Sequence, residues 1–397
     1  MSALLAIILS SISISVALSM LVSKRKIIMK IGISMLAVLV LVLTGCSYHQ
    51  PSETSPNVKK DEITIIKEVD DEVDHNQTKE ESKPKQIADH KEEKERTKPH
   101  QGDEVFHRIN PYVIRDDFKN NITEAEKHSF HQVIDAIMHH EESVTLQTNM
   151  YSNILIDYLI DSHPYMNLVK ETQFDDTYQC IHIQYVYNEK EHQEKLALIN
   201  DFFQNLLNNN IKKGMNDVDK TLAVYQAVGS SICYDYDWYE RFCETDDPYH
   251  FPEISVLEAI ETKKGVCHTY TYLMQFALQQ LYIEALPVEG VSGDRVIDSH
   301  MWLMVKLDDA YYHLDPTWDD QDDKGIGLCY FGLTDQQRKE QGFTLRSGCY
   351  NVEMGDIVCT SKRFAKLQTV TSYRYLKDHQ WQMTTEDGQF IYDTCAD

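Results

Sequence analysis

One segment of this chain limits where a folded core can form. Residues 47–104 hold 16 acidic residues, 10 basic residues and a single aromatic residue, Tyr48. A stretch of this composition buries too little apolar surface to offset the entropy that it would lose on ordering. No apolar face recurs at helical spacing, which disfavours the alternative of one long charged helix. We therefore predict a solvated tether over 47–104, and this confines the folded body to residues 105–397.

The residues before the tether have the composition of an export signal. Four basic residues within 24–30 precede the apolar run Ile31 to Val42, and Leu43-Thr44-Gly45-Cys46 follows. A basic region, a short apolar region and small residues in this order are typical of a secretory signal peptide. The last four residues resemble the lipobox of bacterial lipoproteins. This resemblance implies that Cys46 is diacylated, becomes the first mature residue and anchors the protein to the extracytoplasmic face of the cell membrane. The alternative is a transmembrane helix with an incidental cysteine.

A second apolar stretch, residues 2–22, lies upstream of this signal. It is long enough to cross a bilayer, which takes roughly 20 residues. Either the chain begins with a transmembrane hairpin, or translation starts at Met29 and residues 1–28 are a misassigned start. The second interpretation is favoured, because residues 29–46 form a complete lipoprotein signal by themselves.

The overall composition excludes several classes of protein. Hydrophobic residues make up 42% and charged residues 25%, as in a globular protein. The net charge of −25 argues against nucleic acid as a partner, because a nucleic-acid surface requires basic residues. Nine cysteines are too few for a disulfide scaffold. Every long apolar run ends before residue 46, which excludes a polytopic membrane protein.

The first part of the body, residues 105–210, is predicted to be an α+β subdomain. Thr123 and Glu126 form a capping box ahead of a helix that extends to about Met138. Strands are expected at 166–171 and 179–187, followed by helices to about 207 and over 218–231. The histidines at 128, 131, 139 and 140 lack a further ligand at recognisable spacing, so we expect surface histidines and no metal. No motif for an organic cofactor is present either.

The chemistry is concentrated in residues 255–318. A short helix over 255–260 is followed by Gly265 and Cys267, and apolar residues at helical spacing follow Cys267. The cysteine is therefore expected at a helix start, where the positive end of the helix dipole favours thiolate over thiol. Strands are predicted over 283–291, 300–307 and 311–314, with a turn at 308–309.

The turn sets the register of the last two of these strands. It pairs residues whose numbers sum to about 617, and the numbers of His300 and Asp315 sum to 615. The two side chains are therefore expected to face each other across paired strands. With Cys267 they make the parts of a Cys-His-Asp triad, in which the carboxylate orients the imidazole and the imidazole holds the thiolate.

Three blocks of this segment resemble the transglutaminase-like superfamily: Gly265-Val266-Cys267, Ser299-His300-Met301-Trp302 and Tyr312-His313-Leu314-Asp315-Pro316-Thr317-Trp318. The resemblance covers about residues 216–340. It implies a papain-like core, with a nucleophile helix packed on an antiparallel sheet. It also implies Cys267 as nucleophile, His300 as general base and acid, and Asp315 as the residue that orients His300. His268 and Met301 depart from common members, which leaves the substrate open.

The oxyanion site is predicted from fewer observations. The backbone N–H of Cys267 is one donor, and an acyl-transfer site needs donors aimed at the developing oxyanion. The resemblance implies an aromatic donor some thirty residues before the nucleophile, and Tyr234 fits. The alternative for Tyr234 is plain packing. Trp302 and Trp318 are expected to wall the cleft.

Further expectations concern the rest of the body. Residues 319–323 hold four aspartates but lack the glycine and glutamate of a calcium loop, so we expect a solvated acidic loop. The sequence allows a disulfide in several pairs of cysteines, including Cys233 with Cys243, and does not determine which of them forms. Residues 342–397 are predicted to be a small β extension, with a hairpin turning at 386–388 between Trp381 and Tyr392.

These observations together predict the domain boundaries and the function. We predict a catalytic domain over 211–341 between the subdomain and the extension. The favoured function is a lipid-anchored cysteine acyltransferase or hydrolase that acts on peptide or glutamine amides, with a protein or peptide as substrate. Two alternatives are a non-enzymatic protein-binding module with a papain-like cleft, and a lipoprotein whose front subdomain binds a partner.

Overall fold

The computed structural model describes residues 108–114, 122–146, 163–175, 179–293, 299–321, 325–345 and 357–396. The predicted signal, the lipobox with Cys46 and the tether lie outside the described residues. All described residues fall in one compact unit of the chain. In the part of the chain that the structure describes, no helix is long and apolar enough to cross a membrane.

The N-terminal part combines helices with a small sheet. Helix α3 (Glu124–Met138) begins at the predicted capping box of Thr123 and Glu126. Strands β1 (Ser143–Thr145), β2 (Val169–Asp175) and β3 (Cys180–Tyr185) form an antiparallel sheet in the order β1-β3-β2, and helix α5 (Glu189–Asn210) follows. The strand predicted from Met166 begins later, at Val169, because Pro164 starts a 3-10 helix over Pro164–Leu168.

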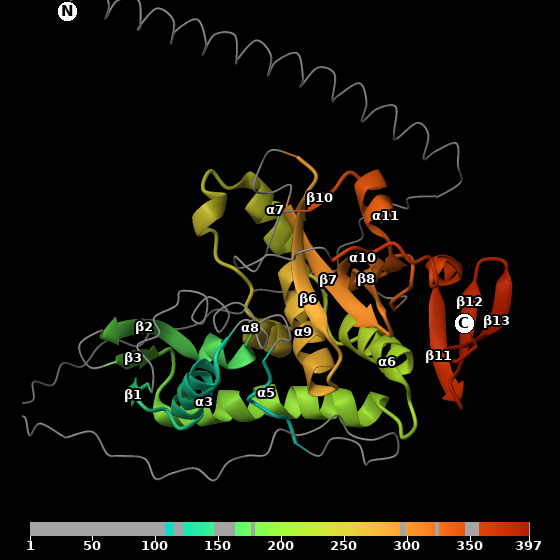
Figure 1. Ribbon diagram of the computed structural model, residues 1–397. Helices are drawn as coiled ribbons and strands as arrows, with labels where there is room; N and C mark the ends of the chain where they lie inside the picture. Colours follow the sequence, from blue (N-terminus) through green and yellow to red (C-terminus); the bar gives the residue numbers. More distant parts are fainter. Residues whose placement is uncertain are drawn as a thin grey trace, which may run out of the picture. The chain divides into compact units, whose positions relative to one another are not determined.

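The central part places the nucleophile helix on an antiparallel sheet. Helix α9 (Cys267–Gln280) packs against strands β6 (Ala285–Val291) and β7 (Ser299–Leu307), with helix α6 (Asp217–Gly229) beside it (Figure 1). The sheet has the order β10-β6-β7-β8-β9. Its other strands are β8 (Ala310–Leu314), β9 (Phe331–Leu333) and β10 (Thr344–Leu345). This arrangement confirms the predicted α+β class.

The hairpin of β7 and β8 has the predicted register. Met304 pairs with His313 and Leu307 with Ala310, so the paired numbers sum to 617 as expected. The pairing ends at Leu303 and Leu314, and Asp315 caps the short helix α10 (Pro316–Asp319). His300 therefore lies near the open end of the hairpin, where Asp315 leaves the sheet.

Several short elements surround the start of α9. Strand β4 (Cys233–Tyr234) pairs in parallel with β5 (Lys264–Gly265), and helix α7 (Tyr236–Glu244) follows β4. Helix α8 (Val256–Thr262) precedes β5, and helix α11 (Asp335–Glu340) follows β9. Through the pairing of β4 with β5, residues on either side of α7 and α8 meet just before the start of α9.

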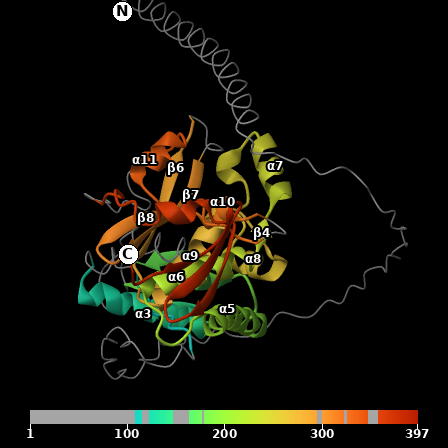
Figure 2. The ribbon, with the colours of Figure 1, turned by 90° about the vertical axis from the view of Figure 1, so that its right-hand side faces the viewer.

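The C-terminal sheet is joined to the core by a buried carboxylate. Strands β11 (Ser372–Lys377), β12 (Gln380–Thr385) and β13 (Gly388–Asp393) follow a 3-10 helix (Ala365–Thr369) and lie beside α6 (Figure 2). Asp219 of α6 is fully buried and accepts hydrogen bonds from Trp381 Nε1 at 2.8 Å, Thr394 Oγ1 at 2.8 Å and His379 Nδ1 at 2.6 Å. The predicted hairpin is confirmed by the pairing of Trp381 with Tyr392.

One hydrophobic core runs through all three predicted parts of the body. It includes Phe130 from the N-terminal part, Phe276 from α9 and Trp381 from the C-terminal sheet. The three parts therefore stabilise one another, whereas the domain boundaries at 210/211 and 341/342 stay predictions.

Candidate functional site

The position of Cys267 follows from the residues just before it. Gly265 pairs with Tyr234, and a Cβ atom at Gly265 would lie 2.9 Å from Cδ1 of Ile232. Because glycine has no side chain, the segment that holds Ile232 and β4 can approach Gly265 of β5 this closely. Helix α9 then begins at Cys267, and the Thr269 hydroxyl accepts a hydrogen bond from the Val266 N–H at 3.2 Å. The thiol thus stands at a helix start, next to the strand that carries Tyr234.

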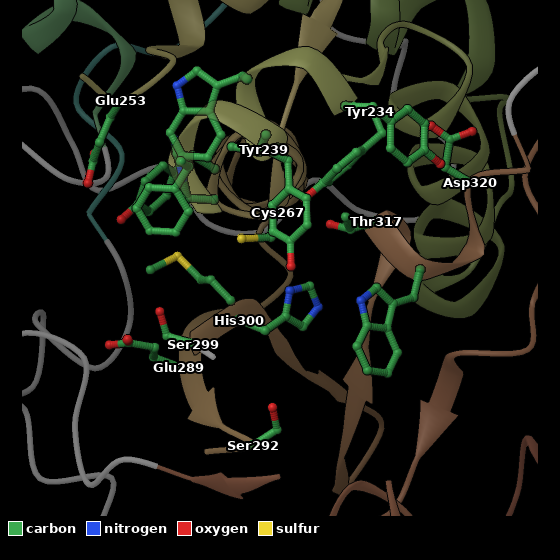
Figure 3. A pocket seen from close by; sticks show the side chains of 18 of the residues that line it. Tyr234, Tyr239, Glu253, Cys267, Glu289, Ser292, Ser299, His300, Thr317 and Asp320 are labelled. Carbon is green, nitrogen blue, oxygen red and sulfur yellow. The ribbon is translucent and has the colours of Figure 1, made fainter. Parts of the chain in front are cut away.

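His300 and Asp315 form the hydrogen bond that the hairpin register predicts. Nε2 of His300 donates to Oδ2 of Asp315 at 2.7 Å, and Asp315 is fully buried. His300 also shares a hydrogen bond with the thiol of Cys267, for which its other ring nitrogen remains (Figure 3). The structure thus brings the three predicted catalytic side chains together.

The electrostatics of this group favour a thiolate beside an imidazolium. Burial opposes ionisation of Cys267, but hydrogen bonds with His268 and His300 and their charges lower its pKa to about 5. Burial also opposes the charge on His300, but the charge and the hydrogen bond of Asp315 raise the pKa of His300 to about 9. Between these two values the sulfur is anionic and the ring is cationic.

His268 is a second histidine on the thiol, and sequence reasoning missed this role. Its Nε2 lies 3.0 Å from the carbonyl oxygen of Ile254, so this nitrogen donates and Nδ1 is left for Cys267. Burial lowers the pKa of His268, but the hydrogen bond and charge of Cys267 and the charge of Glu253 raise it overall. The signal in the sequence that could identify this role is the place of His268 directly after the nucleophile.

Asp315 is held by more than the imidazole. Its Oδ2 also accepts a hydrogen bond from Nη2 of Arg338 at 2.7 Å, and its Oδ1 accepts one from the Trp318 N–H at 3.3 Å. Burial opposes its ionisation, but His300 and Arg338 lower its pKa overall. Arg338 carries no sequence signal, because it lies on a short polar helix beyond the recognised motifs.

Cys267 and His300 line a pocket of about 820 Å³, whereas Asp315 is buried behind them. Its walls are rich in aromatic residues, and the short helix α7 supplies four of them: Tyr236, Trp238, Tyr239 and Phe242. Tyr234 points into the pocket near Cys267, as predicted for an oxyanion donor (Figure 3). Burial and the nearby Cys267 raise the pKa of Tyr234, so its hydroxyl keeps its proton. The α7 aromatics were not predicted from the sequence.

The two tryptophans of the sequence prediction differ in position. Trp318 lines the pocket, and its ring stacks on His300 with 5.0 Å between the ring centroids. Trp302 does not line the pocket, so its prediction as a cleft wall is wrong. The Trp302 ring is fully buried in a small core with Phe343, in space that the absence of a side chain at Gly290 leaves open.

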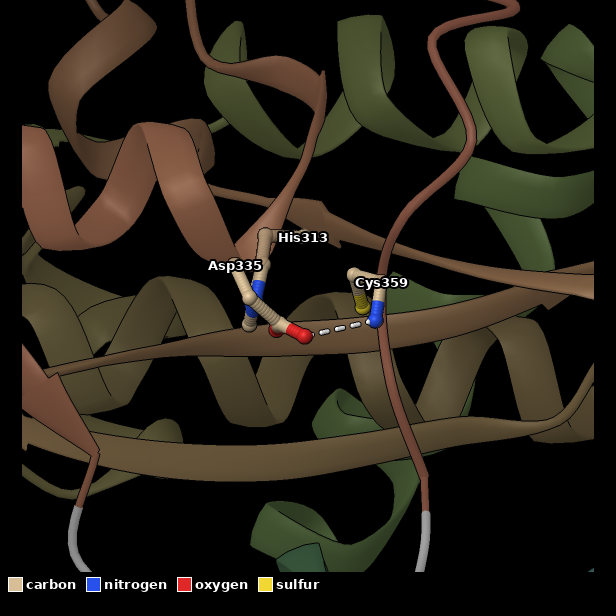
Figure 4. A group of neighbouring side chains, drawn as sticks. All are labelled: His313, Asp335 and Cys359. Carbon is tan, nitrogen blue, oxygen red and sulfur yellow. Dashed lines mark hydrogen bonds and ion pairs between the residues drawn. The ribbon is translucent and has the colours of Figure 1, made fainter.

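His313 and Asp335 form a second histidine–carboxylate pair, with Cys359 next to it (Figure 4). Trp302 Nε1 donates to Nδ1 of His313 at 2.9 Å, and Nε2 of His313 is 2.8 Å from Oδ1 of Asp335. Oδ2 of Asp335 accepts the Cys359 N–H at 2.9 Å. Because Nδ1 accepts, Nε2 carries the proton and offers no lone pair to a metal. Hydrogen bonding therefore accounts for this His-Asp-Cys group.

The expected solvated loop at 319–323 is wrong for its first residue. Asp319 is 1% exposed and accepts hydrogen bonds from the Tyr225 hydroxyl and from the Tyr330 N–H. Burial raises the pKa of Asp319 to about 7. Asp320 accepts a hydrogen bond from Tyr270, while residues 322–324 lie outside the described residues.

The described cysteines are all free thiols, but their surroundings differ. The seven cysteines that the structure describes, including Cys233 and Cys243, are free thiols, and Cys349 lies outside the described residues. Burial raises the pKa of Cys180 and of Cys359. The pKa of Cys267, in contrast to these two, is lowered.

Residues 204–316 match the family model of the transglutaminase-like superfamily. That span contains Cys267, His300 and Asp315 together with the helix and hairpin that carry them. These residues are therefore similar to transglutaminase-like domains. No curated protein matches the chain significantly.

Two solved structures are similar to parts of this chain. One is a proposed cysteine protease from Cytophaga hutchinsonii, with 17% identity, a TM-score of 0.22, and coverage of 40% of this chain and 42% of that chain. The other is a TGase, with 14% identity, a TM-score of 0.27, and coverage of 51% and 55%. The chain thus spans about half the length of each structure, and scores this low carry no argument on fold or activity.

Proposed function

We propose that this protein is a cysteine hydrolase or acyltransferase that acts on peptide or glutamine amides. One observation carries the proposal: a thiol with a lowered pKa stands beside a buried His300–Asp315 pair at the base of an open pocket. Thiolate, not thiol, is the nucleophile in such chemistry, and it requires a base fixed by a third group.

The residues support an acyl-enzyme mechanism. The Cys267 thiolate attacks the amide carbonyl, and a C–S bond forms as the carbonyl oxygen becomes an oxyanion. The Cys267 N–H and the Tyr234 hydroxyl donate to that oxyanion. His300 then gives a proton to the nitrogen as the C–N bond breaks, which leaves a thioester and a free amine or ammonia. A second nucleophile loses its proton to His300 and releases the acyl group.

The second nucleophile decides between hydrolysis and amine transfer, and we favour water. The pocket walls are partly open, with Tyr236 55% exposed, Tyr239 40% and Trp318 38%. Water therefore has access to the thioester, whereas efficient amine transfer requires that water be kept out.

The proposal includes an extracytoplasmic, lipid-anchored location, which rests on the lipobox and Cys46. Replacing Cys46 with Ala should release the protein from the membrane fraction or leave the signal uncleaved. A mature protein whose N-terminus lies at Met1 would refute the anchor and leave the enzymatic proposal intact.

The decisive experiment measures mass changes in a library of glutamine-containing peptides, with and without a labelled primary amine. Deamidation, cleavage and amine incorporation give three different mass shifts. The matched control is Cys267→Ser, which keeps the shape of the site and loses the thiolate. Peptides retained equally by both proteins, without any mass change, would favour the alternative of a binding module.

A further inference from the structure

We propose that Arg338 is a positioning residue that extends the triad to a buried chain of four alternating charges. In the reactive state Cys267 and Asp315 are negative, and His300 and Arg338 are positive. The net charge of these four side chains is therefore zero. The inference rests on the proposed function, because it assigns Arg338 a part in maintaining the thiolate. Arg338 lies on α11, outside the family-model match.

Arg338 contacts the same carboxylate oxygen of Asp315 that accepts the hydrogen bond from His300. Nη2 of Arg338 and Nε2 of His300 both lie 2.7 Å from Oδ2 of Asp315. Nη1 donates to Oε1 of Gln341 at 2.9 Å. Arg338 is 1% exposed, which is rare for a charged residue unless it is paired. Asp315 thus lies between two cationic groups.

The same three aromatic rings surround both cationic groups, the guanidinium of Arg338 and the imidazolium of His300. The guanidinium carbon lies 3.8 Å from the ring centroid of Trp302, 5.3 Å from that of Trp318 and 5.2 Å from that of Phe343. The ring of His300 lies 5.6, 5.0 and 5.8 Å from the same three centroids. Attraction between a cation and an aromatic face offsets part of the cost of removing each charge from water. One aromatic enclosure therefore fixes His300 and Arg338 on either side of Asp315.

The charge balance gives Arg338 a task in the reaction. Without Arg338, a thiolate, an imidazolium and a carboxylate would leave one uncompensated negative charge in a buried site, which is costly. Arg338 cancels this charge and so favours the thiolate. After His300 gives its proton to the leaving group, Arg338 keeps Asp315 anionic, and the Nε2 proton stays on the imidazole.

Other titratable groups face the same cluster. His268 and Tyr234 face Cys267, and His313 and Asp319 act on Asp315 from β8 and α10. Burial keeps His313 neutral by lowering its pKa. The pKa of Asp319 is about 7, so its charge changes within the range of interest. Each measurement below is therefore repeated in an Asp319→Asn background.

The test is the pH dependence of the alkylation rate of Cys267 by iodoacetamide, followed by mass spectrometry of the Cys267 peptide in the full chain. Arg338→Gln and Arg338→Met remove the charge, whereas Arg338→Lys retains it. We expect the acidic midpoint of the profile to move to higher pH, by roughly one pH unit, in the two neutral variants, because a buried cation a few ångströms beyond Asp315 is lost. Arg338→Lys should retain the wild-type midpoint.

A matched control is available at another arginine–aspartate pair. Arg363 bonds to Asp308 in the hairpin turn and its guanidinium carbon lies 5.2 Å from the ring centroid of Phe364, but this pair is more exposed than that of Arg338, with Asp308 68% exposed. Asp308 lies at the opposite end of the hairpin from His300. Arg363→Gln should lower stability without moving the alkylation profile.

The outcomes separate this inference from the proposed function. A wild-type midpoint in Arg338→Gln or Arg338→Met, with Cys267 still the most reactive thiol at acidic pH, overturns the role of Arg338 and leaves the function standing. Wild-type Cys267 that reacts no faster than the exposed cysteines overturns both. If neither neutral variant folds, Arg338→Lys decides: an unchanged midpoint supports a role for the charge, and a shifted one overturns it.

Discussion

Replacing His300 with Ala should reverse the pH preference of Cys267 rather than merely slow its reactions. In the wild type, hydrogen bonds and charges from two histidines lower the pKa of Cys267 to about 5, from an ordinary value of 9.0. His300→Ala removes one of them and leaves His268. The pKa of the thiol should therefore rise, to about 7 if His268 retains half of the net effect and to about 9, the ordinary value, if it retains none.

The size of the effect follows from two opposing factors. At pH 5 half of the wild-type thiol is ionised, but only about 10⁻² to 10⁻⁴ of the variant thiol is. Each unit of thiol pKa also raises the nucleophilicity of the thiolate by a factor of about 3, which gives back roughly 8- to 60-fold. The variant should thus react about 6- to 80-fold more slowly at pH 5 and about 8- to 15-fold faster at pH 8.5.

The assay is the rate of mixed-disulfide formation at Cys267 with a small neutral disulfide, measured from pH 4 to 9. Mass spectrometry of individual peptides is needed, because Cys233, Cys243, Cys329 and Cys395 are exposed and also react. His139→Ala, at an exposed histidine outside the pocket, is the control and should follow the wild-type profile. Two profiles that run parallel without crossing would show that His300 does not ionise the thiol, and the catalytic reasoning would fail.

Three further predictions concern Tyr234, Asp219 and Asp319. Tyr234→Phe should lower turnover about 10²-fold with little change in melting temperature, since one oxyanion donor is lost; unchanged turnover would return Tyr234 to a packing role. Asp219→Ala leaves the buried Trp381 N–H without its acceptor and should lower the free energy of unfolding by about 3 kcal/mol in urea titrations, whereas a loss below about 1 kcal/mol would contradict this. The pKa of Asp319 rises on folding from 3.8 to about 7, so the folded chain binds more protons and stability should fall as pH rises from 4 to 7. Asp319→Asn should remove this decline, at most about 4 kcal/mol, and a decline that persists would refute the assignment.

Much of the reactive segment was predictable, because local patterns determine it. The turn at 308–309 fixes the register of β7 and β8, and the register places His300 near Asp315. Apolar spacing after Cys267 fixes the start of α9. These signals lie within one helix or one hairpin, where sequence distance and spatial distance are closely related.

The remainder depends on contacts between distant segments. Arg338 lies among polar residues on a six-residue helix and would pass for a surface residue, but Trp302 and Asp315 bury it. Alternation along β7 places Trp302 on the same face as His300, and that face is covered beyond His300 by Phe343 and Cys359. Residues outside the sheet decide which part of a sheet face remains open to solvent. The alternation of residues along the strand therefore does not predict it.

The bonds of Asp219 impose an order on the folding of this chain. Its partners Trp381 and Thr394 come 162 and 175 residues later in the sequence. Until they are synthesised, the helix that packs against α9 carries a buried carboxylate without its donors, and the native core costs too much to close. Closure of the core beneath α9 is therefore expected to depend on residues that follow Cys267 by more than a hundred positions. A chain that contains Cys267 but lacks Thr394 would thus hold the three triad residues while Asp219 lacks two of its hydrogen-bond donors.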